Sequence, residues 1–163
     1  MAIFIGRFLL TAELLNRAAS PLIKKQYRFL KDLSFRIKDD YITAEMRGSY
    51  SLLSFEGFVA LRLLEFIFCS PVYRVDLQLS AEVRPRFLRP LMISLLKKEF
   101  ARLPGVNWRG DELRLDLAEM PFFVQVKEAR AWCGLFSKLR ANWDADEKGG
   151  LLFNFHFDEA ELM

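Results

Sequence analysis

The sequence contains few of the residues on which catalytic and metal chemistry depends. Among its 163 residues are two cysteines, Cys69 and Cys133, and a single histidine, His156. A zinc site needs several sulfur, nitrogen or carboxylate ligands, so this set is too small to predict one. Two cysteines without a C-x-x-C motif also exclude a disulfide scaffold. We therefore expect both cysteines to be small buried apolar residues in a reduced protein, and we predict no metal site.

The common cofactor and nucleophile motifs are missing as well. The chain has no glycine-rich phosphate loop and no G-x-S-x-G sequence. Cys133 and His156 are a candidate nucleophile and base, but a structural cysteine and a surface histidine are the simpler interpretation. The acidic pair Asp39-Asp40 falls where a turn is expected, and Arg109-Gly110-Asp111 is also read as a turn. We predict a non-enzymatic protein without a cofactor.

Long apolar runs are absent too. Nothing approaches the roughly 20 apolar residues of a membrane-spanning helix, and the apolar N-terminal run is interrupted by Arg7 and lacks the basic start of a signal peptide. The net charge of +3 is too small to indicate nucleic acid as a partner. We expect a cytoplasmic protein, with membrane association and a trimmed exported form left open.

Phenylalanine, by contrast, is abundant: there are 16 Phe against 4 Tyr and 3 Trp. Because Phe carries no polar atom, it favours a dry core or a cavity over a wet interface. The length fits a single domain, 1–163, with an N-terminal helical segment at 1–32 and a sheet-and-helix module at 33–157.

The chain is organised around two long strands that meet at Ser70-Pro71. Apolar and polar residues alternate strictly from Val75 to Val83, which predicts a strand with one dry and one wet face. The preceding run, 59–68, is apolar enough for a buried strand or a short buried helix. We favour the strand, because the strand that follows needs an adjacent partner.

Alternation predicts four further strands, at 33–38, 42–47, 113–117 and 151–157, with a turn at Asp39-Asp40 joining the first two. We expect 49–57 to connect that hairpin to the central strands, and Gly48 to mark a bulge or a strand end. The four strands between 33 and 83 then form an antiparallel meander.

Helical spacing predicts a helix from about Phe4 to Ala19, which Ser20-Pro21 interrupts and restarts. The basic run within 24–31 is read as a solvated helix face in preference to a membrane-surface helix. A Leu-rich helix is expected from Arg86 to Arg102, with Pro90 in its first turn. A further segment from Pro121 is expected to be helical, because helical spacing brings together Phe122, Val126, Ala129, Trp132, Cys133 and Phe136; a short strand at 122–126 is the alternative. Glu99 falls within the apolar arc of the Leu-rich helix, where it either pairs with Arg102 or faces a pocket.

Together these elements predict an α+β fold. A curved antiparallel sheet, made of the four-stranded meander and two later strands, packs against a long amphipathic helix and an N-terminal helix.

One stretch carries a family resemblance. The Leu-rich helix is followed by Leu103-Pro104-Gly105 and then by the run Gly110-Asp111-Glu112-Leu113-Arg114-Leu115-Asp116-Leu117. This order of elements resembles small single-module proteins of the tubular lipid-binding (TULIP) type, over about residues 33–157. The resemblance implies a strongly curved sheet wrapped around a long helix, with an elongated apolar cavity for lipid.

We therefore expect a lipid or another apolar ligand to bind between the Leu-rich helix and the sheet. The expected ligand-binding residues are Phe58, Phe66, Phe68, Leu88, Met92, Leu95, Phe153, Phe155 and Phe157. The side of the helix bearing Lys97 and Lys98 is expected to meet an anionic membrane. The alternative is a protein-interaction or homodimerisation module with an exposed apolar patch, and the third option is an enzyme whose site the sequence conceals.

Overall fold

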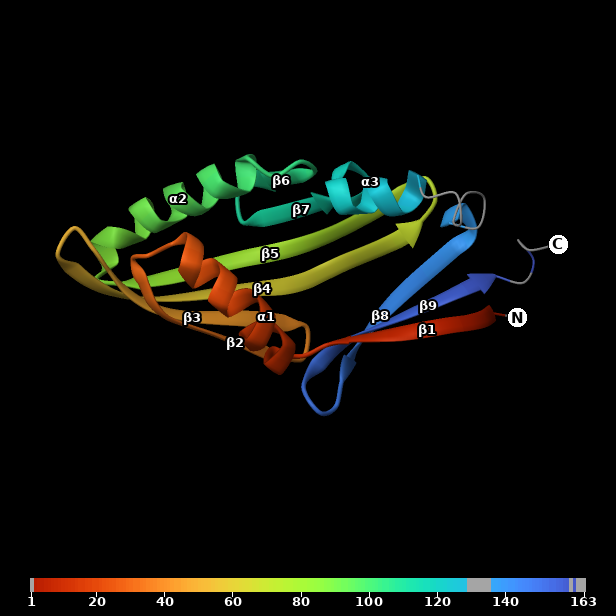
Figure 1. The fold of residues 1–163 in the computed structure, drawn as a ribbon, viewed down its shortest axis with the longest axis horizontal. Coiled ribbons are helices and arrows are strands. Elements are labelled where there is room, and N and C mark those ends of the chain that lie inside the picture. Colours follow the sequence, from red (N-terminus) through yellow and green to blue (C-terminus); the bar gives the residue numbers. More distant parts are fainter. Residues whose placement is uncertain (1, 129–135, 159, 161–163) are drawn as a thin grey trace.

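The described part of the chain folds around one large antiparallel sheet with three α-helices (Figure 1). The computed structural model describes residues 2–128, 136–158 and 160. Over these residues it contains nine strands in an open, unclosed sheet. The predicted α+β class and antiparallel sheet are therefore confirmed.

The central part of the sheet is the expected meander. It consists of β2 (Leu30–Lys38), β3 (Tyr41–Tyr50), β4 (Leu53–Cys69) and β5 (Val72–Arg84), and each strand pairs antiparallel with the next. Residues 59–68 are indeed strand. The expected connector at 49–57 is wrong, because β3 and β4 continue to a two-residue turn at Ser51-Leu52. Residues 53–57 still find partners on β3, so pairing persists to the end of the hairpin.

One side of the meander, the inner face, is dry. Leu63 of β4 and Leu77 of β5 lie opposite each other and are buried there together with Ile37 of β2. β4 changes phase along its length, because a bulge at Leu64 inserts one extra residue between the pairs Leu63–Leu77 and Glu65–Asp76. Odd-numbered residues of β4 therefore face inward before Leu64, and even-numbered residues do so after it.

The N-terminal segment differs from its prediction. Residues 2–10 form β1 (Ala2–Leu10), which pairs with β9 (Gly150–Asp158), so a helix beginning at Phe4 is wrong. The helix is α1 (Ala12–Gln26), where the hydroxyl of Thr11 accepts a hydrogen bond from the Leu14 amide at 3.1 Å. It continues through Pro21, so Ser20 does not restart it. The Ser20 hydroxyl is buried and donates to the Leu33 carbonyl at 2.7 Å.

After β5 the chain forms a short 3-10 turn (Arg86–Leu88) and α2 (Arg89–Ala101), with Pro90 in the first turn as expected. A hairpin follows, β6 (Val106–Arg109) and β7 (Glu112–Asp116), and then α3 (Pro121–Glu128). β8 (Leu139–Asp146) pairs with β9. Strands β1, β6 and β8 come in addition to the six predicted, and the predicted helical positions Ala129, Trp132 and Cys133 lie outside the described residues.

The strand order is β1-β9-β8-β4-β5-β7-β6, with β3 pairing β4 and β2 pairing β3. β8 meets β4 only at its far end, at Ala141 opposite Phe68. From there β8, β9 and β1 diverge from the meander (Figure 1). Leu151 of β9 nevertheless packs against Ile37, Leu63 and Leu77, so the diverging strands close the middle of the core.

Candidate functional site

The start of α2 lies over an apolar groove at one end of the inner face, which we call the α2 groove. Pro85 ends β5, and the following turn places the helix across the end of the meander. Leu88, Met92 and Leu95, at helical spacing, face the sheet. The groove is lined entirely by apolar or aromatic residues: Phe29, Tyr50, Phe55, Leu88, Leu91, Met92 and Leu95. Three of the expected ligand-binding residues, Leu88, Met92 and Leu95, line it.

Phe29 contacts both other aromatic rings of this groove, and no sequence pattern predicted it as a ligand-binding residue. Its ring lies 6.1 Å from the ring of Tyr50, edge to face, and 6.1 Å from that of Phe55. These are favourable separations for aromatic pairs. Phe29 reaches the site because the chain between α1 and β2 crosses close to β3, where the Ser49 amide donates to the Phe29 carbonyl at 3.0 Å.

The α2 groove is small in this structure. Its volume is about 20 Å³, which is room for about one water molecule. Sites for drug-sized ligands usually enclose about 300 Å³ or more. An acyl chain therefore fits only if α2 moves away from the sheet.

The first half of α2 is held by few buried side chains, whereas Phe100 near its end packs on Trp108 of β6, with ring centres 5.7 Å apart. Of the 13 residues of α2 only Met92 is buried, packed beside Phe55 and Val83. At the N-terminal end the guanidinium of Arg89 donates to the Ala81 carbonyl at 2.9 Å. At the C-terminal end Glu99 pairs with Arg102 at 3.2 Å, one of the two arrangements expected for it.

Glu99 also connects α2 to the end of α1. Burial raises the pKa of Tyr27, and a hydrogen bond to Glu99 raises it further. Tyr27 is the residue after α1, so this interaction brings the end of α1 and the second half of α2 together.

The aromatic residues of the expected site lie elsewhere. Phe66, Phe68, Phe155 and Phe157 gather at the far end of the sheet, beside Tyr73 and Leu139, and Phe153 packs against the central core next to them. The ring of Phe66 is 5.2 Å from that of Phe153, and the ring of Phe68 is 5.8 Å from that of Phe155. Phe123 of α3 covers them, 4.9 Å from Tyr73. The structure therefore separates these residues from Leu88 and Met92, which belong to another cluster, and from Leu95, which lines the α2 groove.

Phe58 belongs to neither cluster. It lies on the outer face of the meander, directly between Glu45 of β3 and Glu82 of β5. The next row of that face alternates in charge, from Arg47 to Glu56 to Arg84. These residues border an open depression of about 540 Å³, whose mixed charges favour solvent over an apolar ligand.

Lys97 and Lys98 are exposed on the far half of α2. The ammonium of Lys97 lies 5.6 Å from the centre of the Trp108 ring, a cation–π arrangement. It is therefore partly engaged with β6 rather than projecting freely.

The residues with catalytic potential are scattered. Cys69 is half-buried at the end of β4, His156 is half-buried in β9, and Cys133 lies outside the described residues. Gly110 has a positive φ of 61° within the β6–β7 turn, so Arg109-Gly110-Asp111 is a turn as predicted.

Over residues 2–128, 136–158 and 160, no group of three His, Cys, Asp or Glu side chains is arranged to hold a metal ion. No helix in that part of the chain combines the length and apolarity needed to cross a membrane.

Comparison with known proteins adds no identity to these observations. The chain matches no protein-family model, no curated protein and no solved structure.

Proposed function

We propose that this protein binds an acyl chain, or an apolar ligand of similar shape, beneath α2 and catalyses no reaction. The observation that carries the proposal is the combination of an all-apolar groove with a helix that buries only Met92. The resemblance to tubular lipid-binding proteins adds the expectation that the ligand is a lipid. Of the residues expected from sequence, the proposal keeps Leu88, Met92 and Leu95.

The energetic requirement for opening the groove is modest. Withdrawing Met92 from the sheet costs about 1.5–3 kcal/mol of lost burial. Each methylene of an entering chain returns about 0.8 kcal/mol when it is buried. About four buried methylenes therefore offset the loss of Met92 burial, and further methylenes offset the withdrawal of the half-buried Leu88 and Leu95 and of the Arg89–Ala81 hydrogen bond.

The open state also depends on the contacts at the two ends of α2. The hydrogen bond between Arg89 and the Ala81 carbonyl holds the start of the helix, and the contact between the rings of Phe100 and Trp108, 5.7 Å apart, holds its second half. Movement about the Phe100 end leaves the ring contact intact and lifts Met92. This places the opening at the N-terminal end of α2, beside Tyr50 and Leu91.

The test is uptake of a fluorescent fatty acid, followed in solution without vesicles. Substituting Leu95→Trp fills the groove and is expected to abolish uptake while thermal unfolding stays cooperative. Leu103→Trp is the matched control, because Leu103 is 53% exposed beyond the other end of α2 and does not line the groove. Uptake that is unchanged by Leu95→Trp contradicts the proposal. Native mass spectrometry of the gently purified protein gives an independent reading, through the mass of any retained ligand.

A second candidate function is homodimerisation through β1. This strand lies at one edge of the sheet, and its residues Phe8 and Leu9 are 48% and 40% exposed. The other edges are protected, because α1 covers β2 and β6 is only four residues long. A long apolar edge strand is a template for pairing with a second copy.

Light scattering across a range of concentrations tests this second candidate. Leu9→Lys is expected to abolish a dimer, whereas Leu22→Lys, at an exposed position on α1, leaves it intact. A monomer at every concentration removes the candidate.

A further inference from the structure

The β3–β4 turn and the start of α2 together form an exposed apolar surface, which we call the apolar tip. It comprises Tyr50, Leu52, Leu53, Phe87 and Leu91, which are 41%, 103%, 44%, 66% and 38% exposed. The two segments lie at the same end of the molecule, opposite the end that carries both termini (Figure 1). Tyr50 and Leu91 also line the α2 groove, so the apolar tip adjoins that groove.

Leu52 is poorly suited to its position if the only requirement is folding. Ser51 and Leu52 have φ angles of 48° and 68°, the positive values that a two-residue hairpin turn of type I′ requires. Asn and Gly adopt such angles readily, whereas leucine does so at a cost in free energy. The Leu52 side chain recovers none of that cost, because it is fully exposed. A strained and exposed apolar residue of this kind indicates a contact outside the chain.

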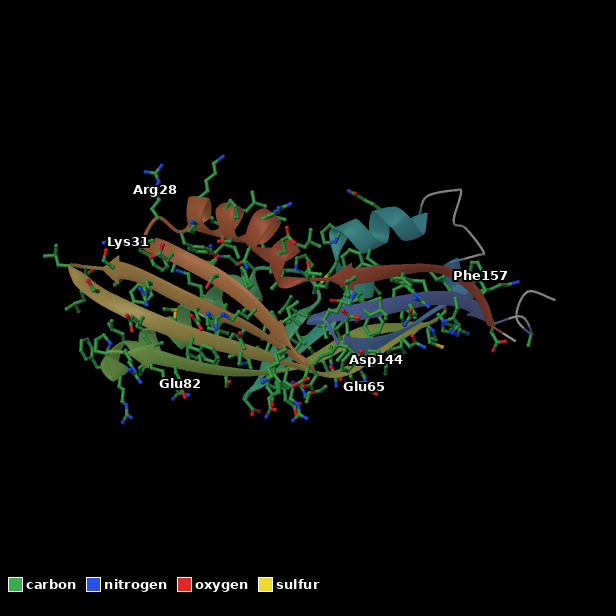
Figure 2. The ribbon with its side chains drawn as sticks, turned by 90° about the horizontal axis from the view of Figure 1, so that it is seen from below. Arg28, Lys31, Glu65, Glu82, Asp144 and Phe157 are labelled. Carbon is green, nitrogen blue, oxygen red and sulfur yellow. The ribbon has the colours of Figure 1, made fainter. Side chains whose placement is uncertain are left out.

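Basic side chains surround the apolar tip. Arg84 and Arg86 lie at the end of β5, and Lys31 and Arg84 both border a second open hollow at this end of the sheet. Arg28 and Lys31 project at this same end of the sheet (Figure 2). No ion pair is recorded for these four residues within the described part of the chain. Asp32 and Glu56 are the acidic residues bordering that hollow, and Glu56 is paired with Arg47 at 3.6 Å.

We infer that the apolar tip docks on an anionic lipid bilayer, with Leu52 and Phe87 entering the interface and the surrounding Arg and Lys side chains contacting the lipid phosphates. Apolar side chains ringed by cations are the arrangement that binds such a surface. The inference rests on the proposed lipid-binding function and names the surface from which the α2 groove takes its ligand. It moves the membrane contact from Lys97 and Lys98 to the opposite end of α2.

The experiment measures co-sedimentation of the full chain with vesicles of phosphatidylcholine alone and of phosphatidylcholine mixed with phosphatidylserine. We expect binding to the mixed vesicles only, weakening as salt is added. Leu52→Asn removes the apolar contact and relieves the backbone strain. It should therefore lower vesicle affinity on the order of tenfold while the melting temperature stays the same or rises. Leu103→Asn, at an exposed leucine away from the apolar tip, is the control and should retain affinity.

The charged contacts are tested with two matched double variants. Lys31→Gln with Arg86→Gln should reduce affinity for the mixed vesicles on the order of tenfold or more. Lys97→Gln with Lys98→Gln removes the same charge from the other end of α2 and should change it little. If the second pair has the larger effect, the docking surface is the one expected from sequence and the inference is overturned.

The remaining outcomes separate this inference from the function on which it rests. Absence of vesicle binding with intact fatty-acid uptake overturns the docking surface alone. Vesicle binding with no fatty-acid uptake overturns the α2 groove alone. A dimer in solution that Leu52→Asn dissociates assigns the apolar tip to a second copy of the chain and overturns the inference.

Discussion

The side-chain amide of Asn16 on α1 pairs with both backbone groups of Phe35 on β2. The Asn16 Nδ2 donates to the Phe35 carbonyl at 3.0 Å, and the Phe35 amide donates to Asn16 Oδ1 at 2.7 Å. One side chain thus makes the two hydrogen bonds that a neighbouring strand would make. Ser20, one helical turn later, donates to the Leu33 carbonyl at 2.7 Å. In this way α1 protects an edge that would otherwise be open to strand addition.

Replacing Asn16 with leucine should destabilise the protein. Two hydrogen bonds are lost at about 0.5–1.5 kcal/mol each, so the free energy of unfolding should fall by about 1–3 kcal/mol. Urea unfolding measures the change. Asn142→Leu is the control, because Asn142 is exposed in β8 and no side-chain hydrogen bond is recorded for it. Equal stability of the two variants would show that the Asn16 amide contributes nothing to the edge.

Gly48 should tolerate no side chain. A Cβ there would overlap the carbonyl of Phe29 and lie 2.9 Å from the ring of Phe55. Gly48→Ala should therefore cost on the order of 1–3 kcal/mol, or more if the backbone cannot shift. At Gly6 of β1, nothing lies within 4 Å of an added Cβ. Gly6→Ala should leave thermal unfolding nearly unchanged, and a similar loss in both variants would contradict the close approach of Phe29 to β3.

Tyr27 should make stability depend on alkaline pH. Burial and the hydrogen bond to Glu99 raise the pKa of Tyr27 above its ordinary value of 10.0. The folded state therefore holds the phenolic proton more tightly than the unfolded chain does. The resulting stabilisation is complete below pH 10 and is lost as the pH rises through the raised pKa of the folded state.

The measurement compares wild type with Tyr27→Phe by chemical unfolding from neutral pH upward. The variant should be less stable near neutral pH, and the difference should shrink above about pH 10 as the wild-type tyrosine ionises. A difference that stays constant across this range would exclude the Tyr27–Glu99 hydrogen bond as its origin.

Alternation was a sufficient guide wherever a strand has one dry and one wet face. It located the hairpin around Asp39-Asp40 and the strand from Val75 to Val83, whose inner residues are buried as expected. It failed for β1, whose run is apolar on both faces and carries no period that separates helix from strand. It failed for β6 because four residues between turns give too short a pattern. Both segments are strands because they pair with a neighbour, β1 with β9 and β6 with β7.

The site was harder to predict than the fold. Helical spacing correctly grouped Leu88, Met92 and Leu95, because a helix face depends only on local geometry. Phe29 could not be assigned to the α2 groove, since its place depends on how the chain crosses β3 at Gly48. The apolar tip was missed because the expected connector at 49–57 hid the turn that exposes Leu52.

Leu64 decides which phenylalanines of β4 are buried. Strict alternation places Phe58, Phe66 and Phe68 on one face, but the bulge at Leu64 reverses the phase between Phe58 and the other two. Phe58 is 37% exposed on the outer face, whereas Phe68 is 8% exposed within the aromatic cluster. One inserted residue thus separates residues that the pattern alone would group.

Deleting Leu64 should therefore abolish the native fold. The deletion turns Phe66 and Phe68 to the outer face, or else turns the first half of β4 out of the core. Removing the buried Phe68 costs about 3–5 kcal/mol and the half-buried Phe66 adds to this, which approaches the whole stability of about 5–15 kcal/mol expected for a domain. Leu64→Ala keeps the bulge and should fold, because Leu64 is already 42% exposed. Near-ultraviolet circular dichroism and thermal unfolding distinguish the two, and a deletion variant that melts like the wild type would mean that the bulge does not set the phase of β4.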